Sequence, residues 1–402
     1  MILRTVRSVT VAGETGMVQT RKFAMEPAVR EFLMCCLRAR LDPRARAAAH
    51  AMALRGLDWE AVWRSAEAER LAPLLHGVLR HEAFVPPHVA KRLASVYRFV
   101  GFRNLALLQE LGVVIRQLAA HGIAAIVLKG AALADTVYRN ISLRPMGDVD
   151  LLLHRPDIRS ALQILATLGY DPARAETHPG AVETYENEVL VRKAAGLGTL
   201  LELHWSLFDS PYYQDKLDLT WWWDTAVSIQ IASAPAKMLG PEAQVVHLCG
   251  HLALHHGGHG LLWLHDIAEV VAAYGTTIDW PAVLSRARAY DLVLPLQQGL
   301  CRVSEEWGAP IPPTVLEQLC MLQPSRGESR IYTWLSAPNR SVAQRFWADV
   351  SSFSGWRARL RFARASLFPS AAYMQQRYRV PHRLLVPLFY PYRWLRGLLS
   401  AF

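Results

Sequence analysis

Arg-Pro-Met-Gly-Asp-Val-Asp-Leu-Leu-Leu, residues 144–153, contains two acidic residues within an apolar segment. Successive side chains of a strand point to opposite faces, so Asp148 and Asp150 share one face and Val149 and Leu151 the other. Carboxylates a few ångströms apart raise each other's pKa, and a bound divalent cation removes that cost. The segment therefore predicts a strand that binds Mg²⁺ through Asp148 and Asp150.

A phosphate-binding loop is predicted just upstream of this strand. Residues 123–128 form a short apolar run that predicts a buried strand, and a helix is expected to follow the glycine at 130. Free backbone N–H groups at such a junction, together with a glycine, let a phosphate approach closely. Lys129 and Arg144 add positive charge nearby. The predicted nucleotide-binding residues are Lys129, Gly130, Ala131, Arg144 and Gly147.

A third carboxylate follows on a later strand. Strands are predicted at residues 188–193 and 199–205, separated by the turn-prone Ala-Ala-Gly-Leu-Gly. Glu202 lies in the second of them, which we expect to neighbour the strand of Asp148 and Asp150. Three carboxylates can hold metal ions that bridge a triphosphate, and one of them can accept the proton of the attacking hydroxyl. Asp148, Asp150 and Glu202 are therefore the predicted catalytic residues and metal ligands.

These motifs resemble the nucleotidyltransferase superfamily with the DNA polymerase beta-like fold, and within it a family of uncharacterised bacterial nucleotidyltransferase-like proteins. The resemblance covers most of the chain. It implies an α+β fold, in which a small mixed-sheet nucleotidyltransferase core is embedded in a mostly helical protein. It also implies that Asp148 and Asp150 are metal ligands, that Glu202 is the third acidic residue, and that Gly130 belongs to the phosphate loop. The motifs that carry it are Leu-Lys-Gly at 128–130, Arg-Pro-Met-Gly-Asp-Val-Asp-Leu-Leu at 144–152, Glu-Leu-His-Trp at 202–205, His-x-x-x-His at 251–255 and Leu-Leu-Trp-Leu-His-Asp at 261–266.

The chain departs from the superfamily pattern at three points. Gly130-Ala131 stands where many members have Gly-Ser or Gly-Gly, which removes a hydroxyl that could contact phosphate. The gap from this loop to Asp148 is longer than in the aminoglycoside-modifying members. Glu202 replaces the commoner aspartate. These departures motivate an alternative function, a catalytically weak nucleotide-binding scaffold.

A cluster of histidines offers a second alternative. His247, His251 and His255 recur at four-residue spacing, which places them on one face of a helix. Histidine and carboxylate at this density can bind zinc, so a metal-dependent hydrolase is one interpretation. The interpretation that we favour is an acceptor pocket beside the carboxylate strand. The residues predicted for that pocket are His204, His251, His255 and Asp266.

The pattern of apolar residues predicts five regions along the chain. Asp58-Trp59 and Asp279-Trp280 begin two similar segments, and each aspartate is predicted to cap a helix. The predicted regions are a flexible N-terminal extension (1–25), a helical N-terminal region (26–120), the nucleotidyltransferase α/β core (121–225), a helical domain with the His-rich helix (240–325) and a basic, aromatic, helical C-terminal region (326–402).

Composition limits the partners that we expect. A net charge of +10 favours anions such as nucleotides, and five scattered cysteines favour a cytoplasmic protein without disulfides. No apolar run reaches the ~18 residues that a membrane span needs. The tail from Tyr378 to Phe402 alternates arginine with apolar residues, so it could lie on an anionic membrane surface or pack on its own domain.

The predicted function combines these features. Nucleoside monophosphate is transferred from a nucleoside triphosphate, expected to be ATP, with Mg²⁺ or Mn²⁺ as cofactor. The acceptor is a small molecule, a peptide, a sugar or RNA that the sequence does not identify, and a peptide or polysaccharide biosynthetic pathway is the expected setting.

Overall fold

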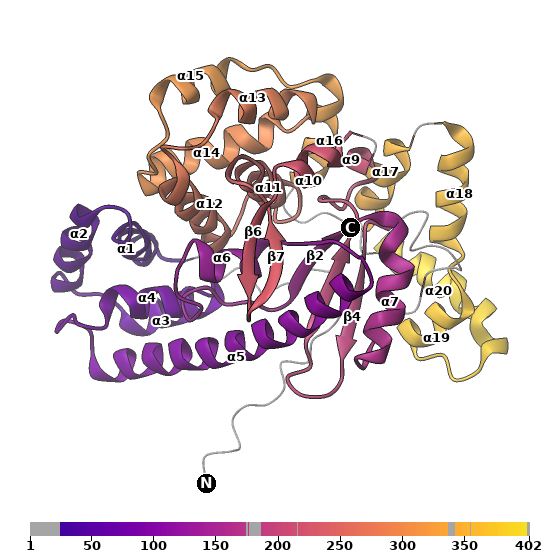
Figure 1. The fold of residues 1–402 in the computed structure, drawn as a ribbon, viewed down its shortest axis with the longest axis horizontal. Helices are drawn as coiled ribbons and strands as arrows, with labels where there is room; N and C mark the ends of the chain where they lie inside the picture. Colours follow the sequence, from indigo (N-terminus) through magenta and orange to yellow (C-terminus); the bar gives the residue numbers. More distant parts are fainter. Residues whose placement is uncertain are drawn as a thin grey trace, which may run out of the picture.

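The computed structural model describes residues 25–399, except 174–175, 177–185, 215, 337–341 and 354. Its fold is α+β, as predicted, because helices surround a mixed sheet of seven strands (Figure 1). The predicted flexible extension at 1–25 lies outside the described residues, apart from Met25. Within the described part of the chain, no helix combines the length and apolar character needed to cross a membrane.

The sheet has the order β3-β4-β5-β2-β1-β7-β6. β2 pairs in parallel with β5 and antiparallel with β1, so the two strands that carry the predicted acidic residues are direct neighbours, as expected. β1 and β7 are also parallel, and the other neighbours are antiparallel. The strands are β1 (Ala125–Val127), β2 (Val149–Leu153), β3 (Tyr170–Pro172), β4 (Glu188–Lys193), β5 (Leu200–His204), β6 (Val227–Ile231) and β7 (Ala234–Met238).

Three of these strands are absent from the sequence prediction. β3 is short and ends in a proline, so it gives little alternating pattern. β6 and β7 form a hairpin whose side chains are mostly not buried, which weakens the same pattern. The sheet therefore continues beyond residue 225, where the predicted core ends.

Helices cover both faces of the sheet. α5 (Pro87–Ala120) and α7 (Ile158–Thr167) share one apolar core with Leu151 of β2 and Leu203 of β5. Leu152 of β2 belongs to a second core on the other face, which α1, α4, α11 and α12 complete. Because Asp150 lies two residues before Leu152, its carboxylate points to this second, helical layer.

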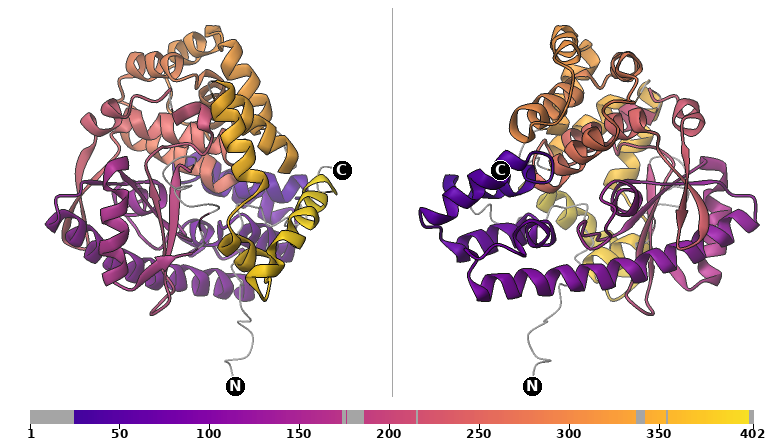
Figure 2. Two further views of the ribbon diagram at one scale, coloured as in Figure 1. Left: turned by 90° about the vertical axis from the view of Figure 1, so that its right-hand side faces the viewer. Right: turned by 60° about the vertical axis from the view of Figure 1, so that its left-hand side comes forward.

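The remaining helices flank these layers. Figure 2 shows α5 running along one side of the molecule beneath the sheet. The helices are α1 (Pro27–Arg38), α2 (Pro43–Leu54), α3 (Trp59–Ala68), α4 (Ala72–Leu79), α6 (Lys129–Thr136), η1 (Arg155–Asp157), α9 (Pro211–Gln214), α10 (Leu219–Asp224), α11 (Pro241–Leu254), α12 (Leu261–Tyr274), α13 (Trp280–Ala289), α14 (Val293–Trp307), α15 (Pro313–Met321), α16 (Arg326–Ser336), α17 (Val342–Ser352), α18 (Trp356–Leu367), α19 (Ala371–Tyr378), η2 (Arg383–Leu385) and α20 (Val386–Leu399).

Both predicted Asp-Trp helix caps are confirmed. The Asp58 carboxylate accepts hydrogen bonds from the backbone N–H groups of the first turn of α3, and Asp279 accepts one at the start of α13. Each segment then ends in the same turn, in which Arg70 or Asp291 has a φ of 60° or 56°. The N–H of the next residue, a leucine in both segments, bonds a carbonyl five residues earlier, at 2.7 and 2.8 Å. The sequence similarity therefore reflects a repeated helix-turn unit.

A buried ion pair between Arg144 and Asp266 links the chain before β2 to α12. The Arg144 guanidinium donates to both Asp266 oxygens, with Nε–Oδ1 at 2.8 Å and Nη2–Oδ2 at 2.7 Å. The side chains are 7% and 1% exposed. The Tyr138 hydroxyl donates a further bond of 2.7 Å to Asp266. The cation that the sequence assigns to phosphate is thus bonded to a carboxylate that the sequence assigns to the acceptor pocket.

We expect Arg144→Met to lower the free energy of unfolding by about 3–5 kcal/mol, because it leaves the Asp266 charge buried without its partner. Urea unfolding measures this loss. The matched control is Arg92→Met, which breaks an ion pair to Glu60 that is about half exposed and should cost at most about 1 kcal/mol. Equal losses in the two variants would contradict a structural role for the Arg144 pair.

Candidate active site

The β2–β5 register brings three carboxylates to one face of the sheet. Asp150 pairs directly with Glu202 across these parallel strands, so their side chains lie next to each other on the same face. Asp148 precedes the first residue of β2 and lies two positions before Asp150. Its side chain is solvent-exposed, although protein surrounds it on most sides, whereas Asp150 is buried. The structure therefore brings together the three acidic residues that the sequence singled out.

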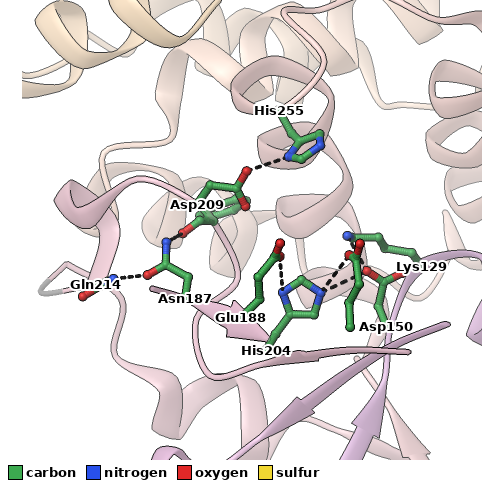
Figure 3. Close-up of polar contacts among 10 residues, drawn as sticks. Lys129, Asp150, Asn187, Glu188, His204, Asp209, Gln214 and His255 are labelled. Carbon is green, nitrogen blue, oxygen red and sulfur yellow. Dashed lines mark hydrogen bonds and ion pairs between the residues drawn. The ribbon is translucent and has the colours of Figure 1, made fainter. Parts of the chain in front are cut away.

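Two basic side chains flank Asp150. Lys129 Nζ lies 2.7 Å from Asp150 Oδ1, and His204 Nε2 lies 3.0 Å from the same oxygen (Figure 3). His204 Nε2 is also 3.5 Å from Glu202 Oε2. Lys129 has a φ of 48°, which L-residues rarely adopt, at the junction between β1 and α6. Such strain is characteristic of positions where the surroundings dictate the conformation, here beside the acidic face.

These contacts make the acidic residues unequal. Burial by itself would raise the pKa of Asp150, but the Lys129 ammonium and the hydrogen bond and charge of His204 hold it well below the usual range. Burial by itself would lower the pKa of His204, but hydrogen bonds to Asp150 and Glu202 raise it to about 10. Asp148 has no such partner: desolvation, followed by the Asp150 and Glu202 charges, raises its pKa to about 6. The surroundings therefore favour the ionised form of Asp150 and disfavour that of Asp148.

Glu188 is a fourth carboxylate at the site, and the sequence prediction missed it. β4 pairs antiparallel with β5 so that Glu188 stands opposite His204, and Glu188 Oε2 lies 3.2 Å from His204 Nδ1. Figure 3 shows the imidazole between Glu188 and Asp150. Desolvation raises the pKa of Glu188 to about 7 against the opposing effect of His204. The sequence shows only an acidic residue at the start of a predicted strand, because the β4–β5 register is a tertiary feature.

Helix α5 fixes the loop that delivers Asp148. The Asn104 amide donates to the carbonyls of Ile141 and Arg144, at 2.6 and 2.8 Å. The Arg103 guanidinium donates to the carbonyls of Met146 and Gly147. Both side chains come from consecutive positions of a helix that packs beneath the sheet, so they pin the backbone just before β2.

Arg70 is a second residue that the sequence prediction missed. Its exposed guanidinium comes from the turn between α3 and α4, and its Nη2 lies 3.7 Å from the point where a Cβ on Gly147 would stand. Burial of its surroundings and the nearby Arg144 charge lower its pKa, against the opposing attraction of Asp148. Hydrogen bonds to Arg70 side-chain atoms are absent among the described residues. A cation able to bind an anion thus stands beside Asp148.

The predicted phosphate loop lies at the start of α6. Gly130 and Ala131 are buried there, and a Cβ on Gly130 would come within 3.4 Å of Arg144 Nη1 and 3.2 Å of Met146 Cγ. The glycine therefore allows the helix start to pack closely against the chain that leads to Asp148.

Helix α11 places the histidine stripe above the acidic face. A Cβ on Gly250 would lie 2.4 Å from the Phe208 ring, so the glycine permits α11 to approach the segment after β5. His255 Nδ1 bonds Asp209 Oδ2 at 2.8 Å (Figure 3), and His251 Nε2 lies 3.0 Å from His256 Nε2. His247 is fully buried, and burial lowers its pKa to about 3. These histidines therefore line the layer that faces the carboxylates.

In the part of the chain that the structure describes, one group of three potential metal ligands has its ligand atoms within 4.8 Å of one another, and its members are Asp150, Glu202 and His204. The histidines around the end of α11 are not members of this group; the rings of His251, His255 and His256 pack against one another, with centroids 4.7–4.9 Å apart. Four carboxylates at the site face the cations Lys129 and His204, with Arg70 beside Asp148, so the fully ionised group keeps an excess negative charge that a divalent cation would offset. The exposed, repelled Asp148 adds an oxygen ligand of the kind that Mg²⁺ prefers. The donor set therefore fits a divalent metal.

Comparisons with known proteins show what the chain is similar to. Residues 55–308 match the family model described as an uncharacterised nucleotidyltransferase. A solved structure described as an antigenic nucleotidyltransferase-like protein from Paracoccidioides brasiliensis is similar at 15% sequence identity and a TM-score of 0.36. The similarity covers 53% of this chain and 96% of that chain. The comparison with curated proteins finds no match.

We expect Asp148→Asn to retain or increase the thermal stability of the metal-free protein while weakening divalent metal binding at least about tenfold. A folded-state pKa of about 6 lies above the unfolded value of about 3.9, so ionised Asp148 opposes folding as the pH rises through this interval. The measurements are the melting temperature at pH 7.5 and a Mn²⁺ titration. Asp171→Asn, at an exposed carboxylate on β3, is the control and should change neither. A large loss of stability in Asp148→Asn would contradict the repulsion.

Proposed function

The chain belongs to the family of uncharacterised nucleotidyltransferases, and from that premise we propose that it transfers a nucleoside monophosphate from a nucleoside triphosphate to an acceptor. ATP is the proposed donor and Mg²⁺, or Mn²⁺, the proposed cofactor. The acceptor hydroxyl or phosphate oxygen attacks the α-phosphorus, a new P–O bond forms, and pyrophosphate leaves. We place the reaction in the cytoplasm, within peptide or polysaccharide biosynthesis.

One observation carries the proposal: the direct pairing of Asp150 with Glu202, with Asp148 two residues before Asp150 on the same face. This arrangement places two carboxylates side by side on adjacent parallel strands, and the third precedes the first residue of β2. The Lys129 ammonium lies at the same face, at the start of α6. Carboxylates and a cation in this arrangement suit a metal-bound triphosphate better than an uncharged substrate.

Each residue has a distinct proposed role. Asp148, Asp150 and Glu202 would hold the metal, which when bound supplies charge neutralisation for the triphosphate and lowers the pKa of the attacking hydroxyl. Lys129 keeps Asp150 ionised and oriented. Glu188 is a positioning residue, because its bond to His204 Nδ1 directs the opposite ring nitrogen toward Asp150.

Cations beside the acidic face would bind the phosphates. Arg144 is bonded to Asp266, so we assign the triphosphate contact to Arg70, whose guanidinium carries no such bond. Gly130 and Ala131, at the start of α6, would contribute backbone N–H groups to the phosphates. We assign the acceptor to the layer between the sheet and α11, where His204, His251 and His255 lie.

The proposal is tested with the four nucleoside triphosphates, each labelled at the α-phosphate, and candidate acceptors. We expect Mg²⁺-dependent incorporation of label and release of pyrophosphate, with a loss of at least about 100-fold in Asp148→Asn and Glu202→Gln. Asp171→Asn should retain full activity. These two positions are preferred over Asp150, because removal of a buried, paired charge would also unfold the protein.

Binding of Mg²⁺ with a non-hydrolysable ATP analogue separates the enzyme from the scaffold alternative. Binding that depends on Asp148 and Glu202, without turnover on any acceptor, would favour a nucleotide-binding scaffold. Unchanged nucleotide binding in both variants would overturn the proposed site itself.

Arg70→Asn is expected to weaken the affinity for the Mg²⁺–ATP analogue about tenfold, because a charged hydrogen bond contributes roughly 1.5–3 kcal/mol. Asparagine tolerates a positive φ better than arginine, so the fold should be retained. Calorimetric titration measures the affinity, Arg70→Lys should restore part of it, and Arg64→Gln, at an exposed arginine of α3, is the control. An affinity equal to that of the unmodified protein would exclude Arg70 from the phosphate site.

A further inference from the structure

The last 53 residues hold most of the net charge of the protein. From Val350 to Phe402 the chain has nine arginines and neither aspartate nor glutamate, whereas the whole chain has a net charge of +10. Eight of the nine arginines are exposed: Arg357, Arg359, Arg361, Arg364, Arg377, Arg379, Arg383 and Arg396. This basic segment lies beyond the residues matched by the family model.

Large apolar side chains are exposed in the same segment. Leu384 is 80% exposed, Leu388 71% and Trp356 69%. Nine of the exposed large apolar residues fall in this stretch: Trp356, Leu360, Leu367, Phe368, Leu384, Leu385, Leu388, Tyr392 and Leu395. Exposed apolar side chains at this density, surrounded by cations, mark an interaction surface.

Two of these side chains also pack within the segment, because the Phe368 ring contacts Tyr390 and Trp394 and the Tyr392 ring contacts Tyr378 and Phe389. Met374, Val380 and Val386 form a separate small core, against which Phe389 and Tyr390 pack. Exposed residues recur at helical spacing: Leu388 and Tyr392 are four apart in α20, and Trp356 and Leu360 are four apart in α18. Leu384 of η2 precedes Leu388 by the same interval. Arg364 and Arg396 continue the same two rows. Figure 1 places α18, α19 and α20 together at the end of the molecule opposite α1 and α2.

We propose that the exposed arginine and apolar side chains of α18, η2 and α20 bind the surface of an anionic lipid bilayer. Arginines near such a surface are attracted to the lipid headgroups, while leucine and tryptophan side chains enter the boundary between headgroups and acyl chains. The absence of carboxylates from residue 350 onward means that no negative side chain of the segment opposes this approach. Aliphatic leucines favour lipid over RNA, which binds arginine and aromatic side chains but offers no apolar layer for leucine.

The test is flotation of the full-length protein with vesicles of phosphatidylcholine alone or with 30% phosphatidylglycerol, roughly the anionic fraction that attracts polybasic segments. We expect binding to the anionic vesicles, and about 100-fold weaker binding in Arg361→Gln/Arg364→Gln/Arg396→Gln, because each arginine near the surface contributes about 1 kcal/mol. Leu384→Gln/Leu388→Gln/Leu395→Gln should weaken binding similarly, because it removes the side chains that enter the bilayer. Circular dichroism of each variant checks that the helices remain folded.

Matched controls come from the N-terminal helices. Arg44→Gln/Arg55→Gln/Arg64→Gln removes three exposed arginines, and Leu54→Gln removes a leucine that is 70% exposed; both should bind as the unmodified protein does. Equal flotation of tail variants and controls would overturn the proposal, as would equal binding to neutral and anionic vesicles. Binding of a single-stranded RNA that depends on the tail arginines, without vesicle binding, would assign the surface to nucleic acid instead.

Discussion

The arrangement of the site depends on one constraint, the parallel register that sets Asp150 directly beside Glu202. Two strands buried in the middle of a sheet cannot slide by one residue without moving every apolar side chain to the wrong face. Leu151 and Leu203 fix that register through the core with α5 and α7. The acidic residues on the opposite face are thereby held together although they repel one another.

The surroundings of the site compensate the negative charges of these carboxylates unequally. Asp150, the buried member, is neutralised by Lys129 and His204, and both bonds come from elements that the sheet itself orients. Asp148 lies just before the first residue of β2, where its side chain is exposed. No ion pair of Asp148 occurs among the described residues. A buried charge requires a permanent partner, whereas an exposed one tolerates repulsion. Asp150, with its permanent partners, therefore belongs to the structural part of the site, and Asp148 belongs to the part that can accept a ligand.

Features that depend on residues close together in the sequence were predicted, whereas features that depend on contacts between distant residues were not. The α+β class, β2, β4, β5 and the helices α11 to α14 were predicted, because apolar periodicity and glycine or proline breaks are local. Asp148, Asp150 and Glu202 were brought together by the expected neighbouring strands. Glu188 depends on an antiparallel register, and Arg70 on the packing of an N-terminal turn against the loop before β2. Neither relation leaves a mark in the local sequence.

Arg144 shows how a partner far along the chain can bond a residue for which the local sequence suggests another contact. Its position before Asp148 suggested phosphate, but its guanidinium is bonded to Asp266, far along the chain. The repeated helix-turn unit supplies the cation instead. Its two copies end in the same positive-φ turn, yet Asp291 in the second copy is buried and accepts a bond from the Tyr212 hydroxyl, while Arg70 in the first is exposed beside Asp148. The positive φ at Arg70 is therefore a property of the repeated turn. What differs between the two copies is the side chain at this position, and the arginine of the first copy lies beside the site.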